Sequence, residues 1–316
     1  MPTFPELLNT LSEDNSTRGF QFEKLCKWLL ENHPIYKSKI KNVWLWEDWP
    51  DRWGKDLGID LIAEDYEKKV WAIQAKCYKP IYSIKKTDVD SFLNESTNKK
   101  IHHRLLIAST DRIGTNATNV IKRANEVLPI NQFLLTDLLQ APIDWPETVD
   151  KLFQAKVTRA FKPRPYQKLA IDNVAKNLNH RGQLIMACGT GKTLISLWIH
   201  ERISRETTLV LLPSLLLLSK TLTEWLAQAK ETFKYLPVCS DETVTKSKDA
   251  INLSRSDLCF PSTTEIDSIV KFMKTPGRKV IFSTYQSSKK ISEAFKSSDL
   301  NPIDLVIADE AHRCAG

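Results

Sequence analysis

A glycine-rich turn between two apolar segments restricts the fold of this chain more than any other feature. Residues 183–187 (Gln-Leu-Ile-Met-Ala) predict a buried strand, residues 188–191 a tight turn, and residues 192–199 an apolar helix. Glycines allow backbone N–H groups to close around a phosphate, and the amino end of the helix adds positive potential. The order of strand, turn and helix therefore predicts a nucleotide-binding α/β domain.

Each residue type at this turn has a task in phosphate binding. The turn itself is made by Gly189, Thr190 and Gly191. We expect Lys192 to reach the terminal phosphates and Thr193 to hold Mg²⁺. The general pattern GxxxxGK[ST] has a small residue where this chain has Met186. A glycine turn that binds nothing is therefore the alternative for this segment taken alone.

A second motif, residues 304–312, supplies acidic groups that suit such a turn. Its apolar strand ends at Asp309 and Glu310. Open α/β sheets bind their ligands at the carboxyl ends of the strands. We therefore expect Asp309 to bind the Mg²⁺ of the nucleotide, and Glu310 to orient and deprotonate the attacking water.

The length of the chain favours two domains, because 316 residues exceed the size of one compact core. Prolines between Asp137 and Pro165 interrupt the regular periodicity of apolar residues, as expected of a connection between domains. We place the boundary at residue 155, which gives domains of residues 1–155 and 156–316. In the second domain strands and helices alternate, which predicts a parallel sheet flanked by helices.

The composition narrows the partners and the location of the chain. A net charge of +7 favours polyanionic partners such as nucleic acid. The six cysteines form no CxxC pair and no cluster at zinc spacing, which is typical of a reducing cytoplasm. The most apolar run, residues 209–218, is too short for a membrane span, and residues 1–10 lack the pattern of a signal peptide. The expectation is a cytoplasmic protein.

Polar residues gather on two predicted strands of the first domain. Asp60 lies in an apolar strand, where an unpaired carboxylate would be costly. In the next strand, alternation places Gln74 and Lys76 on one face. Asp60 and Gln74 offer oxygen ligands for Mg²⁺, and the Lys76 amine suits positioning or deprotonating water. Glu23, on an earlier helix, adds a carboxylate. A buried ion pair of Asp60 with Lys76 is the structural alternative.

The motifs of the second domain resemble those of superfamily 2 helicases and DNA translocases. Motif I is Ala-Cys-Gly-Thr-Gly-Lys-Thr at residues 187–193, and motif II is Asp-Glu-Ala-His at residues 309–312. The resemblance assigns adenine recognition to Gln167, next to Arg164. It covers residues 161–316 and stops before the second RecA-like lobe, which supplies the arginine finger. It implies ATP as a cofactor, and little or no ATP hydrolysis by this chain alone.

The polar set of the first domain resembles the Mrr-like branch of the PD-(D/E)xK nucleases, whose third motif is often QxK. This resemblance covers residues 17–136. Together the domains are similar to the N-terminal part of Type ISP single-polypeptide restriction-modification enzymes. The implied fold is a Mrr-like restriction-endonuclease fold, with a mixed sheet flanked by helices, followed by a partial RecA-like parallel α/β domain. The implied partners are double-stranded DNA, the second lobe, and methyltransferase and target-recognition parts.

Two functions stay open at this point. In the first, a Mg²⁺-dependent endonuclease domain acts with the ATP-binding part of a translocase in restriction of foreign DNA. In the second, the chain is a nuclease-inactive, nucleotide-responsive DNA-binding or recruitment module, because the amide of Gln74 binds metal less strongly than a carboxylate. Basic residues that could meet DNA phosphates are Lys85, Lys86, Lys99, Lys100 and Arg104, although solvated helix faces explain them almost as well.

Overall fold

The protein is described by a computed structural model that covers residues 2–54, 58–154, 161–204, 206–240 and 257–311. The chain divides into two compact units. The first consists of Met1–Thr158 and Ser256–Pro261, and the second of Arg159–Arg255 and Ser262–Gly316. A short piece of the later sequence thus belongs to the first unit. Within the described ranges, no helix combines the length and apolar character needed to cross a membrane.

The first unit is built on a five-stranded mixed sheet with the order β1-β2-β3-β4-β5. The strands are β1 (Ile40–Leu45), β2 (Leu61–Asp65), β3 (Val70–Lys76), β4 (Ile101–Ala108) and β5 (Ile130–Phe133). The first three strands pair antiparallel, whereas β3, β4 and β5 are parallel. This arrangement confirms the expected mixed sheet.

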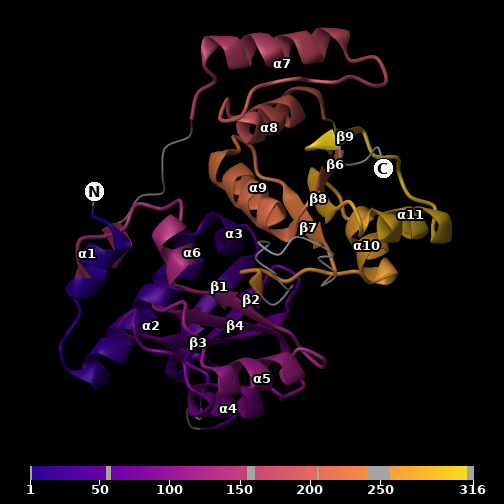
Figure 1. Ribbon diagram of the computed structural model, residues 1–316. Helices are drawn as coiled ribbons and strands as arrows, with labels where there is room; N and C mark the ends of the chain where they lie inside the picture. Colours follow the sequence, from indigo (N-terminus) through magenta and orange to yellow (C-terminus); the bar gives the residue numbers. More distant parts are fainter. Residues whose placement is uncertain (1, 55–57, 155–160, 205, 241–256, 312–316) are drawn as a thin grey trace. The chain divides into compact units, whose positions relative to one another are not determined.

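Helices cover both faces of this sheet (Figure 1). They are α1 (Phe4–Asn9), α2 (Asn15–Asn32), α3 (Pro34–Lys37), α4 (Lys86–Glu95), α5 (Thr115–Ala124) and α6 (Leu135–Gln140), with short 3-10 turns η1 (Trp46–Asp48) and η2 (Val149–Gln154). Apolar side chains of α4 and α5 pack on one face of the sheet with Ile62, Ala72 and Leu106. Helix α2 contacts β1 and β3 from the other face. Both faces of the central strands are therefore buried.

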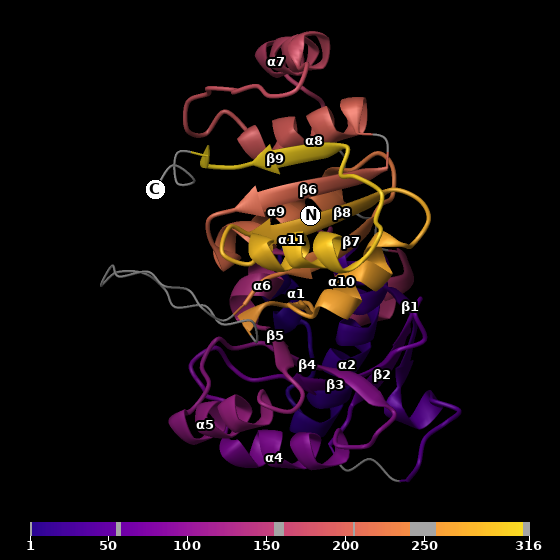
Figure 2. The same ribbon diagram turned by 90° about the vertical axis from the view of Figure 1, so that its right-hand side faces the viewer.

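The second unit contains a parallel sheet with the order β7-β8-β6-β9, seen strand by strand in Figure 2. The strands are β6 (Thr207–Leu212), β7 (Lys234–Val238), β8 (Lys279–Thr284) and β9 (Leu305–Ala308). The helices are α7 (Pro165–Asn177), α8 (Lys192–Ile203), α9 (Leu215–Gln228), α10 (Ile266–Met273) and α11 (Ser288–Ser297). Helices α10 and α11 bury one face of the sheet, and α9 packs against β6 and β8. The expected parallel α/β domain is confirmed.

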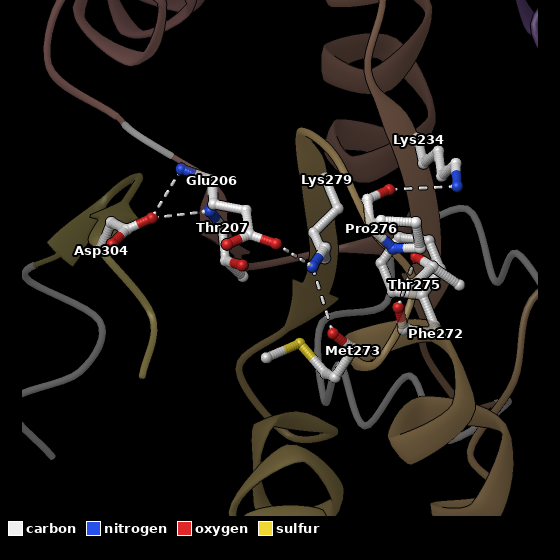
Figure 3. Close-up of polar contacts among 9 residues, drawn as sticks. All are labelled: Glu206, Thr207, Lys234, Phe272, Met273, Thr275, Pro276, Lys279 and Asp304. Atoms are coloured by element: carbon white, nitrogen blue, oxygen red, sulfur yellow. Dashed lines mark hydrogen bonds and ion pairs between the residues drawn. The ribbon is translucent and has the colours of Figure 1, made fainter. Parts of the chain in front are cut away.

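A buried cation secures the amino ends of these parallel strands (Figure 3). The side chain of Lys279 is only 2% exposed, and its Nζ donates to Glu206 Oε1 at 2.9 Å and to the Met273 carbonyl at 3.1 Å. Nearby, Asp304 Oδ2 accepts hydrogen bonds from the backbone N–H groups of Glu206 and Thr207. A charge is tolerated here because it is paired and hydrogen-bonded. These contacts join the starts of β6 and β8 to the end of α10.

One sequence prediction is wrong. Residues 183–187 were expected to form a buried strand, but they have no regular structure and are largely exposed, with Ile185 at 83%. A strand needs ladder partners, because each backbone N–H and C=O group requires a hydrogen bond. In the described sheet, β9 pairs only with β6, and Val306 of β9 is exposed. The apolar composition of residues 183–187 was therefore not sufficient to predict a strand.

Candidate functional sites

Asp60 lies at the start of β2, against the carboxyl end of β3. Its backbone N–H donates to the Ile73 carbonyl at 3.0 Å, and its own carbonyl accepts from Trp46 at 3.0 Å. The carboxylate turns toward β3, where Oδ2 accepts a hydrogen bond from the Ala75 N–H at 2.6 Å. This bond fixes the half-buried carboxylate beside the residue that separates Gln74 from Lys76.

Gln74 faces this carboxylate across the strand pair. The antiparallel register pairs Leu61 with Ile73. Asp60, which precedes Leu61, therefore lies opposite Gln74, which follows Ile73, on one face of the sheet. Gln74 is 1% exposed, and its Nε2 donates to the Gly58 carbonyl at 3.2 Å. Its Oε1 is buried and has no hydrogen-bond partner among the residues that the structure describes. Such an atom costs about 1–3 kcal/mol unless a ligand satisfies it.

Gly58 was missed by the sequence analysis, although it holds the Gln74 amide. Its φ is +130°, in a region that side chains rarely adopt. A Cβ atom at this position would lie 2.8 Å from Ser91 Oγ and 2.9 Å from the Phe92 nitrogen. The close approach of α4 therefore requires glycine here. In the sequence, Gly58 is only a glycine that precedes an apolar strand, and this pattern alone gave no reason to select it.

Lys76 is the last residue of β3 and is half-buried. It lies two positions after Gln74 in the strand, so both side chains leave the strand on the same face. Its carbonyl accepts a hydrogen bond from the Ser109 N–H at 3.0 Å, which keeps the end of β3 paired to the end of β4. The amine is thus carried by backbone that is fixed on both sides of the strand.

Glu23 lies on α2. Burial raises the pKa of the Cys26 thiol well above its usual range, and Cys77, Asp60 and Glu23 add smaller electrostatic contributions in the same direction. The charges of Glu23 and Asp60 therefore both act on the Cys26 thiol.

The donor set at this site fits a hard divalent cation through oxygen atoms. In the described part of the chain, no group of three His, Cys, Asp or Glu side chains is arranged to hold a metal ion. The available oxygens are instead a carboxylate, from Asp60, and the partnerless amide oxygen of Gln74. Mg²⁺ prefers oxygen ligands and retains several waters, so one or two protein ligands are sufficient.

A wide cavity of about 1340 Å³ is lined by Cys77, the residue that follows Lys76 in the chain. Four cationic side chains line it, from the start of α2, the loop after β3 and the start of α4: Arg18, Lys79, Lys85 and Lys86. Two acidic residues, Glu13 and Asp88, also line it. The positive side chains outnumber the negative ones, which suits a polyanion.

The expectation that Arg104 meets phosphates is wrong. Arg104 is buried, and its guanidinium donates to the carbonyls of Leu128 at 3.0 Å and of Ser96 at 3.2 Å. Burial lowers the pKa of this guanidinium. The side chain closes the carboxyl end of α4, where free carbonyl groups favour a cation. A sequence cannot distinguish this role from a surface role, because both use a basic residue on a strand.

The glycine turn of the second unit has the backbone of a phosphate-binding loop. Gly189 and Gly191 have φ values of +75° and +79°, and α8 begins directly afterwards with Lys192 and Thr193. Thr190 stabilises the turn by donating from Oγ1 to the Ala187 carbonyl at 2.7 Å. Successive N–H groups in such a turn form a concave site for an anion. Helix α8 also packs against β9, which carries the acidic motif.

Gln167 supports this loop from α7. Its Nε2 donates to the Thr190 carbonyl at 3.0 Å, and its Oε1 accepts from the Arg164 N–H at 2.8 Å. A Cβ atom on Gly191 would lie 2.7 Å from Gln167 Nε2. Tyr166, which the sequence analysis missed, also donates from its hydroxyl to the Thr190 carbonyl at 3.2 Å. In the described structure Gln167 thus contacts the loop itself.

The acidic motif follows β9. Asp309 continues the ladder by donating its N–H to the Leu211 carbonyl at 2.9 Å, and its Oδ1 accepts from the Glu310 N–H at 3.1 Å. Glu310 has a φ of +54°, which is rare for a residue with a side chain and is found at functional turns. Tyr285, at the end of β8, donates its hydroxyl to the Asp309 carbonyl. His312 lies outside the described residues.

Comparison with known protein families identifies both halves of the chain. Residues 31–154 match a family described as restriction endonuclease, and residues 160–316 match the family of the Type III restriction enzyme res subunit. The chain therefore joins a restriction endonuclease domain to a helicase-type domain. No curated protein matches the chain.

Solved structures give a more particular assignment. The chain matches the ATP-dependent Type ISP restriction-modification enzyme LlaBIII, solved bound to DNA, over 100% of its length, with 33% identity and a TM-score of 0.81. A nuclease-deletion mutant of the Type ISP enzyme LlaGI, in complex with a DNA substrate mimic, covers 48% of the chain and 15% of its own, with 37% identity and a TM-score of 0.39. Over its whole length, the fold of the chain is similar to that of this Type ISP enzyme LlaBIII. The chain spans 20% of LlaBIII.

Proposed function

We propose that the first domain is a Mg²⁺-dependent DNA endonuclease whose ion is held by Asp60 and Gln74. The observation that carries this proposal is the buried Oε1 of Gln74, which has no partner among the described residues and lies across the strand pair from Asp60. A buried acceptor of this kind is rare in folded proteins and calls for an explanation. A bound cation with its water shell would satisfy it.

The side chains of this site have separate tasks in phosphodiester hydrolysis. When bound, Mg²⁺ supplies positive charge next to the phosphate and makes its bound water more acidic. Asp60 contributes a full negative charge in an orientation fixed by the Ala75 N–H. Lys76 positions the attacking water and stabilises the charge that develops on the phosphate oxygens. Glu23, on α2, is the second carboxylate that we assign to this site.

The cavity lined by Cys77 is proposed as the path of the DNA backbone. Duplex DNA carries about one negative charge per 1.7 Å of helix axis, so a nuclease needs cations on either side of the phosphate that it cuts. Arg18, Lys79, Lys85 and Lys86 line this cavity. Lys86 is ion-paired with Asp90 at 2.8 Å and would have to exchange this partner for a phosphate.

For the second domain, we infer ATP binding with Mg²⁺ at the loop of Gly189–Gly191. Lys192 would contact the terminal phosphates, and Thr193 and Asp309 would hold the cation. Lys192 begins α8 and Asp309 follows β9, and these two elements pack together. We further infer that this domain works with a second RecA-like lobe and with methyltransferase and target-recognition parts, because the chain spans a fifth of a Type ISP enzyme.

A plasmid-cutting assay tests the nuclease proposal. Supercoiled plasmid, Mg²⁺ and purified chain should give nicked or linear DNA, and EDTA should abolish the reaction. Lys76→Ala should reduce the rate by about 10²- to 10⁴-fold, the usual contribution of a positioned acid or base. Asp60→Ala should reduce it at least as much while DNA binding, measured by fluorescence anisotropy, is retained. Lys69→Ala serves as the control, because the side chain of this lysine, in the turn between β2 and β3, is 40% exposed.

One observation favours a second candidate function, that of a nuclease-inactive DNA-binding module. No group of three metal-binding side chains occurs in the described residues, and an amide replaces one carboxylate. If the parent chain binds DNA but gives no Mg²⁺-dependent cutting, the nuclease proposal is wrong and this second function holds.

A further inference from the structure

A three-residue piece of the later sequence completes the first domain. Leu258, Cys259 and Phe260 are all buried, and Phe260 is 0% exposed. They belong to the same compact unit as Met1–Thr158, although Arg159–Arg255 of the second unit lie between them in the chain. Burying Leu and Phe side chains contributes about 1.5–3 kcal/mol each. The first domain therefore includes residues that a boundary near residue 155 would exclude.

The polar contacts of this piece are specific. Asn131, on the edge strand β5, donates from Nδ2 to the carbonyls of Leu258 and Phe260, both at 2.9 Å. The hydroxyl of Tyr36 donates to the Cys259 carbonyl at 2.7 Å. The Gln132 N–H donates to the Leu258 carbonyl at 3.4 Å. All three carbonyl groups thus have partners in the first domain, and the piece lies along the open edge of its sheet.

The chain then reaches the sheet of the second domain within three residues. Thr263 donates its N–H to the Pro237 carbonyl at 3.1 Å and forms a parallel bridge with Val238. Val238 ends β7, which is the edge strand of that sheet. Three residues extend over at most about 11 Å. Phe260 and Thr263 therefore lie no more than about 11 Å apart, whatever the arrangement of the two domains.

We propose that residues 258–263 are a strap that holds the edge strand β5 of the nuclease domain to the edge strand β7 of the helicase-type domain. The strap connects the two units in addition to residues 155–160. It is short and is hydrogen-bonded at both ends. The proposal does not depend on nuclease activity or on ATP binding.

Cutting the other connection tests the strap. Residues 155–160 are replaced by a protease site in the full chain, the site is cleaved, and the product is analysed by gel filtration at micromolar concentration. The two fragments should elute together, because the strap on the second fragment stays bound to the first. If they elute separately, the proposal is overturned.

Variants show whether the strap is responsible. Asn131→Leu removes the two side-chain hydrogen bonds to the carbonyls of Leu258 and Phe260, so it should raise the dissociation constant of the cleaved fragments at least about tenfold. Phe260→Ala should separate the fragments as well. Because Phe260 lies on the second fragment, this variant leaves the first fragment unchanged and tests the strap even if Asn131→Leu does not fold. Asn94→Leu, at an exposed position of α4, is the matched control. Fragments that stay together equally well in Phe260→Ala and in the control would overturn the proposal.

Discussion

The two candidate sites differ in how they are held. Asp60, Gln74 and Lys76 lie on or beside paired strands, and backbone hydrogen bonds fix their positions on both sides. The phosphate-binding loop follows residues 183–187, which are exposed and belong to no strand. It is supported instead by side chains of α7, above all Gln167. The comparison teaches that the nuclease site is organised by its sheet, whereas the nucleotide site depends on a few side-chain contacts.

The largest expected effect tests whether the two sites are independent. Lys192→Ala removes the cation that we assign to the terminal phosphates. Hydrogen bonds to charged groups contribute about 1.5–3 kcal/mol, so the affinity for ATP should fall by about 10- to 150-fold. Titration with a fluorescent ATP analogue measures this loss. Plasmid cutting without ATP should be unchanged, and a parallel loss of cutting would show that the sites are not separate.

A glycine pair sharpens the contrast within the loop. Gly189 and Gly191 both have positive φ values, but only a Cβ atom at Gly191 meets a neighbour, Gln167 Nε2, at 2.7 Å. Each alanine substitution places a side chain at a positive φ, which costs roughly 1 kcal/mol. Gly191→Ala should also displace Gln167 and weaken ATP binding further than Gly189→Ala does. Equal affinities of the two variants would contradict the role of Gln167 as support of the loop.

A further difference between the two domains concerns pH. His200, in the second domain, is buried and its Nδ1 lies 2.8 Å from Thr208 Oγ1. Burial, with a smaller contribution from Arg278, lowers the pKa of His200 to about 4. The neutral ring therefore stabilises the fold above pH 6.5, and this stability is lost as the pH falls from 6.5 toward 4. For one proton the loss is about 1.4 kcal/mol per pH unit.

Urea unfolding between pH 7.5 and 4.5 measures this dependence. His200→Gln should unfold with a shallower loss of free energy than the parent over the same range. His33, in the first domain, has its pKa lowered by burial to about 3 and remains in both proteins. Some acid sensitivity should therefore persist in the variant. Identical slopes in the two proteins would show that His200 is not buried in its neutral form.

The same contrast explains what the sequence could predict. Alternation in residues 71–77 placed Gln74 and Lys76 on one face because a strand paired on both sides keeps a strict period of two. The run at residues 183–187 has a similar apolar composition, yet a strand forms only where partners supply its hydrogen bonds. The position of residues 258–260 in the first domain depends on contacts across more than 120 residues, such as that with Asn131. No local pattern encodes such a contact.

Metal binding by Gln74 tests the central claim most directly. The affinity of the chain for Mn²⁺, a spectroscopic substitute for Mg²⁺, can be measured by electron paramagnetic resonance of the free ion. Gln74→Leu keeps the volume and removes Oε1, so the affinity should fall at least about tenfold, whereas Gln74→Glu should bind at least as tightly as the parent. If Gln74→Leu binds Mn²⁺ as tightly as the parent chain, Gln74 is not a ligand and the proposed site is wrong.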